Sequence, residues 1–145
     1  MTTKRTGTPW MAADAYGKTL AGLSLNLIVR DVAASLPFYR DVLGMTVHYS
    51  DEDMAALALG TTQIVLHADH TYDQQPWAKR LAAAGKRGLG AEIRILGIDA
   101  DAAERRATIH GATVLLSARD WPHGWRDVIL EDPDGYTFAV GTALS

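Results

Sequence analysis

Residues 23–44 read LSLNLIVRDVAASLPFYRDVLG, and they carry the clearest structural signal in the chain. Leucine or valine occupies every second position over 23–29, which predicts a β-strand with two unlike faces. Asp31 follows as a candidate helix cap, because its carboxylate can accept hydrogen bonds from free backbone N–H groups. Apolar residues then recur every three or four positions, which predicts a helix that ends at Gly44. Pro37 lies inside this pattern and leaves the start of the helix open.

The same pattern returns in the second half of the chain. A strand is predicted over 91–98, Asp99 is the candidate cap, and a helix continues to Gly111. The interval from aspartate to glycine is 13 positions in the first half and 12 in the second. Three short strands are predicted after each helix, at 46–49, 55–59 and 63–67 and at 113–116, 125–131 and 136–140. We therefore predict two β-α-β-β-β modules, an α+β fold whose curved mixed sheets surround one ligand cavity.

Length and composition indicate one domain. The chain has 145 residues, of which 48% are hydrophobic and 21% charged, as in globular proteins. We assign 1–21 to an N-terminal arm and 22–141 to the domain, with module one at about 22–68, a linker with a short helix at about 69–88, and module two at about 89–141. Trp10 and Tyr16 favour an arm that packs either on its own domain or on a partner chain.

Charge and cysteine content restrict the function. The formal net charge is −3, which argues against nucleic acid and anionic membranes as partners. The chain has no cysteine, which excludes disulfides, thiolate metal sites and a cysteine nucleophile. No apolar run approaches the length of a membrane span, and the N-terminal residues lack the apolar core of a secretory signal. We therefore expect a soluble cytoplasmic protein.

Two motifs carry a family resemblance. Residues 35–44 read SLPFYRDVLG and follow the first strand and cap, and residues 132–136, DPDGY, form the last predicted turn. Together with the repeat, they resemble the vicinal oxygen chelate superfamily, which includes glyoxalase I, bleomycin-resistance proteins, fosfomycin-resistance enzymes and extradiol dioxygenases. The resemblance covers about residues 22–141 and implies the glyoxalase/bleomycin resistance fold. It also implies a homodimer, in which the N-terminal arm could act as a clasp.

The resemblance further implies where a metal ion would be held. Metal-using members take ligands from four strand positions, which correspond here to Ser24, Val65, Glu92 and Ala139. Only Glu92 offers a strong donor, since Val65 and Ala139 have no donor atom and serine is a poor ligand. We therefore expect no metal ion or other cofactor. A register error of one residue would bring Asn26 or Gln63 into consideration.

The loop before the strand at 125–131 holds three candidate ligand contacts, Trp121, His123 and Trp125. Two indoles at a loop could stack on an aromatic or cationic ligand. A histidine there could act as an acid or a base near neutral pH. The alternative is that both tryptophans seal the edge of the core.

Charged residues at two strands are also candidates. Glu92 and Arg94 share one face of their predicted strand, as either a structural ion pair or a pair of cavity-lining charges. Glu92 could bind a cationic group or act as a general base. His67, Asp69 and His70 match no metal-ligand spacing, and we interpret them as a polar loop, with contact between His67 and a ligand as the alternative.

Two other features are given structural roles. Asp51, Glu52 and Asp53 are interpreted as a solvated turn, since carboxylates are rarely buried. Tyr39, which belongs to the first family motif, is predicted to pack in the core.

The candidate ligand contacts are therefore Ser24, His67, Glu92, Arg94, Trp121, His123 and Trp125, and the candidate catalytic groups are Glu92 and His123. The leading hypothesis is a metal-free protein that binds a small molecule, a drug or a metabolite, between the modules. The alternative is a metal-dependent lyase, isomerase or dioxygenase of the same superfamily, which would need a divalent metal. A third hypothesis is metal-free acid–base catalysis by Glu92 or His123.

Overall fold

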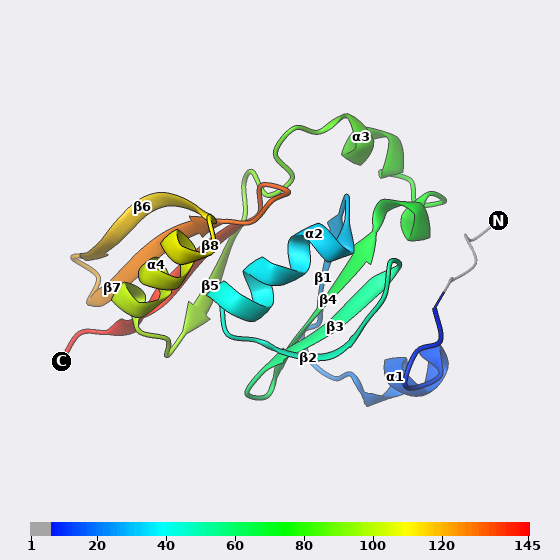
Figure 1. Ribbon diagram of the computed structural model, residues 1–145, viewed down its shortest axis with the longest axis horizontal. Helices are drawn as coiled ribbons and strands as arrows, with labels where there is room; N and C mark the ends of the chain where they lie inside the picture. Colours follow the sequence, from blue (N-terminus) through cyan, green and yellow to red (C-terminus); the bar gives the residue numbers. More distant parts are fainter. Residues whose placement is uncertain (1–6) are drawn as a thin grey trace. The chain divides into compact units, whose positions relative to one another are not determined.

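The computed structural model describes residues 7–145 and contains two four-stranded sheets (Figure 1). The first has the strand order β1-β4-β3-β2, with β1 at Leu25–Val29, β2 at Thr46–Ser50, β3 at Met54–Leu59 and β4 at Thr62–Ala68. The second has the order β5-β8-β7-β6, with β5 at Glu92–Leu96, β6 at Thr113–Asp120, β7 at Trp125–Glu131 and β8 at Thr137–Ala143. β1 is parallel to β4 and β5 to β8, and the other neighbours are antiparallel. The predicted α+β class, with two β-α-β-β-β modules of mixed sheet, is confirmed.

The chain divides into two compact units, each built on one sheet. The first unit holds the residues up to Leu36 together with Gly44–Ala83, and the second holds Pro37–Leu43 together with Ala84–Ser145. The segment after β4 contains a short 3-10 helix, η2 (Asp69–Tyr72), and the helix α3 (Ala78–Ala83). The predicted polar loop is therefore partly helical, and the predicted short helix is present.

Both predicted aspartate caps are present. Oδ1 of Asp31 accepts a hydrogen bond from the backbone N–H three residues later, at 3.0 Å. Oδ1 of Asp99 does the same at 2.7 Å, at the start of α4 (Ala100–Ile109). Such bonds satisfy N–H groups that have no partner within the helix. Gly44 and Gly111 follow the two helices with φ angles of +76° and +69°, a backbone conformation that glycine adopts without strain.

Pro37 changes the geometry of the first helix. The α-helix α2 (Val32–Pro37) ends there, and the chain continues as a π-helix, η1 (Phe38–Val42). The N–H of Leu43 donates to the carbonyl of Phe38 at 3.0 Å, a bond that spans five residues. Proline has no N–H to donate and its ring crowds the preceding turn, which favours a wider turn at this point.

The two family motifs meet in the core of the second unit. Tyr39 of η1 is fully buried, and its hydroxyl donates to Oδ2 of Asp132 at 2.7 Å. Nε of Arg106 in α4 donates to a carbonyl of η1 at 2.8 Å, and the rings of Phe38 and Phe138 lie 5.3 Å apart. Tyr39 therefore packs in the core as predicted, and it also joins the motif of the first helix to the motif of the last turn.

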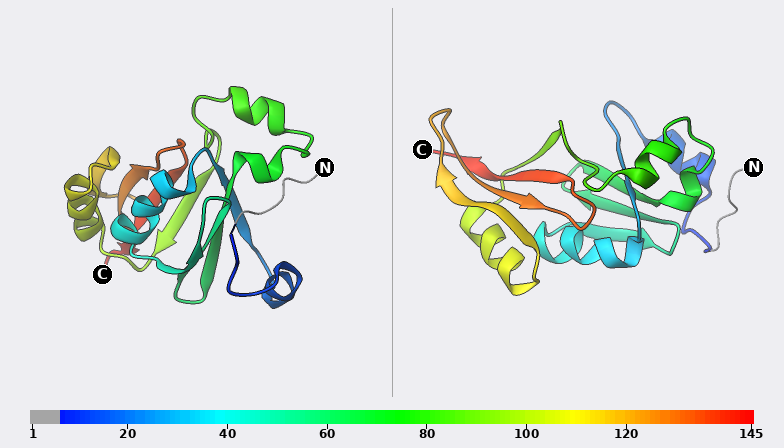
Figure 2. Two further views of the ribbon diagram at one scale, coloured as in Figure 1. Left: turned by 45° about the vertical axis from the view of Figure 1, so that its right-hand side comes forward. Right: turned by 90° about the horizontal axis from the view of Figure 1, so that it is seen from above.

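The two faces of the second sheet have different surroundings. α4 packs against this sheet (Figure 2), on the face that carries the fully buried side chains of Val128, Leu130 and Phe138. Because side chains alternate along a strand, Asp127 and Ile129 lie on the opposite face. That opposite face holds the candidate site.

The N-terminal arm, which has no helix signal in the sequence, is partly helical. The helix α1 (Ala13–Thr19) has no buried residue (Figure 1). The ring of Trp10 stacks on Tyr49 with centroids 5.3 Å apart, and the hydroxyl of Tyr16 donates to Oε1 of Gln63 at 3.1 Å. The described part of the arm therefore packs on the first sheet of its own chain, while the rest of the predicted arm, 1–6, lies outside the described residues.

The prediction of a solvated turn at 51–53 is wrong for Asp53. This residue is fully buried, and Nε2 of His70 lies 2.6 Å from its Oδ1. Oδ1 of Asp51 accepts hydrogen bonds from the N–H groups of Asp53 and Met54, each at 2.9 Å. A buried carboxylate needs such a partner, and His70 reaches it from a segment that is distant in the sequence.

Candidate ligand-binding site

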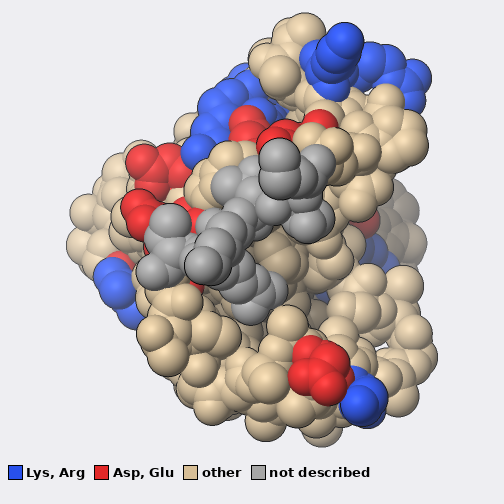
Figure 3. Space-filling view, turned by 90° about the vertical axis from the view of Figure 1, so that its right-hand side faces the viewer, with Lys and Arg blue, Asp and Glu red and all other residues tan. Residues whose placement is uncertain are grey.

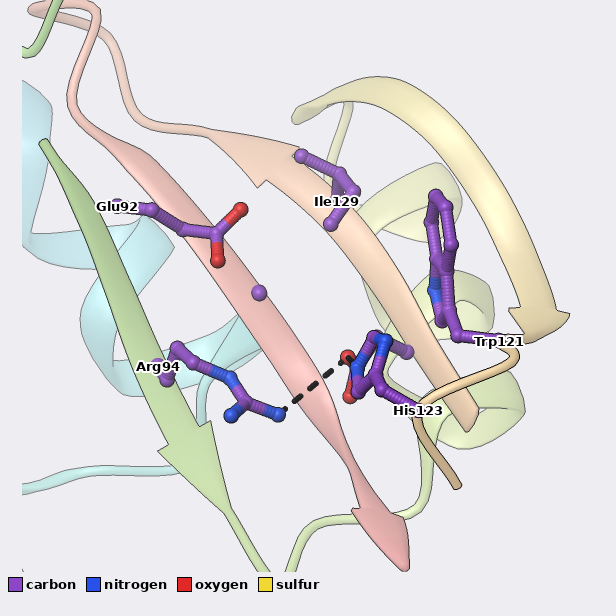
Figure 4. Close-up of a pocket in the computed structure, with 7 residues that line it drawn as sticks. Glu92, Arg94, Trp121, His123 and Ile129 are labelled. Carbon is purple, nitrogen blue, oxygen red and sulfur yellow. Dashed lines mark ion pairs between the residues drawn. The ribbon is translucent and has the colours of Figure 1, made fainter. Parts of the chain in front are cut away.

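A pocket in the second unit gathers four of the seven predicted ligand contacts (Figure 4). It has a volume of about 270 Å³ and is lined by Glu92, Arg94, Trp121, His123, Asp127, Ile129 and Ala139. Small-molecule sites in proteins are usually concave, with apolar walls and a few polar groups that fix the ligand. This pocket combines apolar side chains with a few charged groups, and its volume lies just below the usual range of about 300–1,000 Å³.

Sheet register explains why these residues share one face. Arg94 of β5 pairs with Ala139 of β8, and Ala139 pairs with Ile129 of β7. Directly paired residues point to the same side of a sheet. Glu92 lies two residues before Arg94, and Asp127 lies two residues before Ile129, so both belong to the same face.

Asp127 contributes a buried carboxylate to the lining of the pocket. It is 4% exposed, and its Oδ2 lies 3.6 Å from Nη2 of Arg94 and 3.9 Å from Nε2 of His123. A buried carboxylate is costly unless a cation accompanies it, and Arg94 supplies that cation. Oδ1 of Asp127 has no hydrogen-bond partner within residues 7–145. It lies against Gly141, where an added Cβ would come within 2.2 Å of it, so glycine makes room for the carboxylate.

The loop between β6 and β7 supplies the aromatic wall. The N–H of Trp121 donates to the carbonyl of Trp125 at 2.8 Å, and Gly124 has a φ of +89°, so a glycine turn closes the hairpin. The ring of His123 stacks on that of Trp121 at 6.1 Å between centroids. The guanidinium of Arg94 lies 5.0 Å from the ring centroid of Trp125, which is a cation–π arrangement. Trp125 thus joins the site through Arg94.

Glu92 is the second carboxylate of the pocket. Its side chain is exposed and extends from β5 over the sheet (Figure 4). Arg94 is directed to Asp127, and the described part of the chain holds no ion pair between Arg94 and Glu92. Of the two arrangements predicted for these residues, the structure contains the pair of cavity-lining charges.

The other two predicted contacts, Ser24 and His67, belong to the first unit. Ser24 precedes β1 and lines a groove of about 300 Å³, to which Leu23 and Gln63 also contribute. His67 lies on β4, half-buried, with its ring 4.9 Å from that of Tyr72. Neither residue lines the pocket on the second sheet.

Two lining residues, Asp127 and Ile129, had no signal in the sequence that singled them out. Alternation from Trp125 places both on the face of that indole. A single aspartate within a strand does not, however, reveal whether a distant cation accompanies it. The buried position of Asp127 depends on Arg94, which lies on another strand of the sheet.

The corresponding face of the first sheet is filled. Met54, Ala56 and Val65 form a buried apolar cluster there, and the rings of Tyr16 and Tyr49 pack against it. Tyr16 belongs to α1, so the N-terminal arm supplies part of this cover.

The residues do not fit the metal centre that the superfamily resemblance implies. Val65 is buried in the apolar cluster and Ala139 lines the pocket, and neither side chain has a donor atom. Ser24 lines a different groove, so Glu92 is the one strong donor of the four positions. Within residues 7–145, no three His, Cys, Asp or Glu side chains are grouped so as to hold a metal ion. One carboxylate completed by waters makes a weak and unselective site.

A separate buried carboxylate closes the turn between β7 and β8. Burial raises the pKa of the Asp132 carboxyl, while hydrogen bonds from Tyr39 and from the N–H of Tyr136 act in the opposite direction. Burial, followed by the negative charge of Asp132, raises the pKa of the Tyr39 phenol well above its usual value. Oδ1 of Asp132 also accepts the N–H groups of Asp134 and Tyr136, at 3.0 and 2.8 Å. These bonds give Asp132 a structural role.

Charges of both signs occur on the face shown in Figure 3. Basic side chains gather at the top of this view, the end at which α3 lies, and α3 carries Lys79 and Arg80. Acidic side chains are scattered over the rest of the visible surface. Within residues 7–145, no helix has the length and apolar character needed to cross a membrane.

Comparisons with known proteins agree with this architecture. A glyoxalase/bleomycin resistance protein/dioxygenase family enzyme from Burkholderia phytofirmans PsJN is 21% identical, with a TM-score of 0.68 over 83% of this chain and 97% of that chain. A lactoylglutathione lyase from Agrobacterium tumefaciens is 21% identical, with a TM-score of 0.63 over 84% and 92%. A glyoxalase/bleomycin resistance protein/dioxygenase from Nocardioides is 18% identical, with a TM-score of 0.65 over 91% and 93%.

At these identities, the solved structures show a shared fold and nothing about activity. No protein with curated annotation matches the chain. The family model of the glyoxalase-like domain matches residues 24–141, which includes both predicted motifs, the whole first sheet and all but the last two residues of β8 in the second. The vicinal oxygen chelate resemblance is thereby confirmed, and the chain belongs to the glyoxalase-like domain family.

Proposed function

We propose that the protein binds a small organic molecule in the pocket on the second sheet, without the help of a metal ion. The observation that carries this proposal is the pocket itself, in which a buried Asp127 orients Arg94 beside an aromatic wall. Charged groups that are already held in fixed positions next to apolar surface can orient a ligand, because they lose little conformational entropy when it binds. The occupant is a drug or a metabolite of modest size.

Metal independence is supported by the chemistry of the side chains. Two of the four positions that hold metal in the superfamily are Val65 and Ala139, which cannot coordinate any ion. A metal-dependent lyase, isomerase or dioxygenase of this superfamily would need at least two or three protein donors to act as a Lewis acid centre.

Metal-free acid–base catalysis is the second candidate function, because both candidate groups line the pocket. Nε2 of His123 lies 3.9 Å from Oδ2 of Asp127, and Glu92 extends into the same space. Either group could exchange a proton with a bound ligand. Turnover that resists a chelator and disappears in Glu92→Gln would support this candidate, and turnover unchanged by Glu92→Gln and by His123→Ala would reject it.

The test of metal-independent binding uses protein purified without a metal-affinity tag. Elemental analysis is expected to find less than stoichiometric Ni, Zn, Mn and Fe. A thermal-shift screen of antibiotics and metabolites in the presence of a chelator is expected to find compounds that raise the melting temperature, because a ligand of the folded state stabilises it by mass action. Stoichiometric metal that is lost in Glu92→Ala would contradict the proposal.

We also propose that the protein is a cytoplasmic homodimer with a small-molecule ligand and no nucleic-acid or membrane partner. The net charge of −3 supports the exclusion of polyanionic partners. The dimer rests on the family resemblance alone. Light scattering at micromolar concentration is expected to give twice the mass of the chain, and a monomeric mass would refute the dimer.

A further inference from the structure

We propose that the pocket on the second sheet selects an organic cation, an ammonium or amidinium group attached to a planar apolar body. This inference rests on the proposed function and names the class of ligand for that same site. Four observations support this ligand class: the charge balance of the pocket, the partner of Arg94, the position of Glu92 and the apolar surface of the lining.

The charge balance is negative. The lining contains two carboxylates, Glu92 and Asp127, and one guanidinium, Arg94, with His123 as an additional group that can be neutral. The local field in a partly enclosed space therefore favours positive charge, because the low-dielectric walls screen it less than bulk water does.

Arg94 is already occupied, although it is the group that would ordinarily attract an anion. Its Nη2 lies 3.6 Å from the buried carboxylate of Asp127, and its guanidinium lies over the ring of Trp125 at 5.0 Å. An anionic ligand would have to approach Arg94 beside the two carboxylates. Like charges at short range in such a site disfavour that approach.

Glu92 is available for a cation. The described part of the chain contains no ion pair or side-chain hydrogen bond that involves its carboxylate, which extends into the pocket (Figure 4). A carboxylate in this position can accept charge-assisted hydrogen bonds from the N–H groups of an ammonium or amidinium.

The remaining lining residues provide a surface for the planar body of the ligand. Trp121 forms one wall, and Ile129 lies on the sheet between it and Glu92 (Figure 4). Ala139, which pairs with Ile129, also lines the pocket. Indoles offer an extended flat surface that packs well against rings. The volume of about 270 Å³ suits a bicyclic body with one short substituent.

The test compares three probes of nearly equal shape by titration calorimetry in a chelating buffer: naphthylmethylammonium, naphthylmethanol and naphthoate. We expect the cation to bind about tenfold more tightly than the alcohol, which is the contribution of a hydrogen bond to a charged group, and naphthoate to bind most weakly. Glu92→Gln is expected to weaken the cation about tenfold and to leave the alcohol unchanged. The matched control Glu52→Gln removes the same charge from an exposed turn of the first unit and is expected to change nothing.

Asp127→Asn tests independently whether the buried carboxylate keeps Arg94 from attracting an anion. This variant removes the counter-ion of the guanidinium but keeps the shape of the side chain, so the preference for the cation over naphthoate is expected to fall. An unchanged preference would overturn the assigned role of Asp127.

The outcomes separate the two proposals. If the alcohol and the cation bind equally well, or if Glu92→Gln weakens both alike, the assignment of a cationic ligand is overturned while metal-independent binding stands. If none of the three probes binds while the thermal-shift screen finds other ligands, the assignment of a planar organic cation is overturned and metal-independent binding stands. If neither experiment finds a ligand, both proposals fail.

Discussion

The two sheets have the same strand order, but the face that is covered by side chains in the first sheet carries a pocket in the second. In the first sheet the middle row is Asn26, Val65 and Ala56, and in the second the matching row is Arg94, Ala139 and Ile129. The first face is covered by the aromatic rings of Tyr16 and Tyr49, whereas the second is a pocket with charged walls.

The next row of residues shows how the difference arises. His67 and Met54 pair in the first sheet, and Gly141 and Asp127 occupy the matching places in the second. In the first sheet Met54 belongs to the buried cluster under the rings of Tyr16 and Tyr49, and His67 is half-buried beside it. The glycine of the second sheet leaves space for a carboxylate, which then holds Arg94. The two modules of the duplicated fold therefore differ on the same face, since the first carries an apolar cluster and the second a pocket.

The largest effect is expected from Gly141→Ala, which tests the glycine in this comparison. An added Cβ would lie 2.0 Å from the carbonyl oxygen of Arg126 and 2.2 Å from Oδ1 of Asp127, so the strands must shift. We expect a loss of about 3 kcal/mol in the free energy of unfolding, measured by urea denaturation. The matched change in the first sheet, His67→Ala, removes only a half-buried ring and is expected to cost about 1 kcal/mol. Equal losses of unfolding free energy in Gly141→Ala and His67→Ala would contradict the special role given to the glycine.

A second comparison places serine at the two positions that lack metal donors. Val65→Ser puts an unpartnered hydroxyl into the buried cluster and removes apolar volume, so we expect a loss of about 2 kcal/mol in stability. Ala139 is 1% exposed but lines the pocket, so Ala139→Ser adds a hydroxyl next to open space without removing apolar volume, and we expect a smaller loss of about 1 kcal/mol. Urea denaturation of both variants measures the difference. A cost at Ala139 as large as that at Val65 would mean that the second face is also filled.

The two sheets also differ at the turn before their last strand. Gly60, in the turn between β3 and β4, is exposed. Asp132, in the turn between β7 and β8, is buried and accepts a hydrogen bond from Tyr39. Tyr39→Phe removes this hydrogen bond, and we expect a loss of about 1–2 kcal/mol near neutral pH. Burial already raises the pKa of Asp132, and loss of the donor raises that pKa further. The folded variant then holds the proton over a wider pH range than the unfolded chain, so its stability falls more steeply as the pH rises.

Urea denaturation of the Tyr39→Phe variant and of the unchanged protein, at acid and at neutral pH, tests the predicted direction of this pH dependence. The stability deficit of the variant is expected to be smaller in acid, where Asp132 is protonated in both proteins. A deficit that is independent of pH, or larger in acid, would contradict the role of Tyr39 as the donor to an ionised carboxylate.

The smallest effects are expected in the aromatic cover of the first sheet. Trp10 is 44% exposed, so Trp10→Ala is expected to cost about 1 kcal/mol through the stacking on Tyr49. Tyr16→Phe removes only a solvent-exposed hydrogen bond to Gln63 and is expected to cost about 0.5 kcal/mol. Neither variant should alter binding of the naphthylmethylammonium probe. Weaker binding in Trp10→Ala would show that the arm belongs to the site.

The repeat, the two caps and the order of strands and helices along each module follow from local patterns, which is why they could be predicted. Asp31 and Asp99 cap helices through N–H groups only three residues away. Pro37 marked the irregular part of the first helix, although the π-helix that follows it depends on packing within the second unit. Side-chain chemistry alone also indicated that Val65 and Ala139 cannot hold a metal ion.

The buried carboxylates could not be predicted, because their burial depends on partners far away in the sequence. Asp53 resembles the solvated residues beside it, and its sequence gives no sign that His70 comes within 2.6 Å of its carboxylate. Asp127 depends in the same way on Arg94, from a strand that lies more than thirty residues earlier. Ser24 was a candidate through the family resemblance and His67 through the chemistry of its loop, and the structure places both in the first unit.

The four tryptophans allow the most direct test of binding at the second sheet. Trp10 and Trp77 belong to the first unit, and Trp121 and Trp125 belong to the second. A two-dimensional NMR titration with naphthylmethylammonium in a chelating buffer would follow the indole N–H signals of all four. We predict that the signals of Trp121 and Trp125 shift with the probe while those of Trp10 and Trp77 stay in place. Shifts confined to Trp10 and Trp77, or shifts that appear only after a metal ion is added, would contradict metal-independent binding in this pocket.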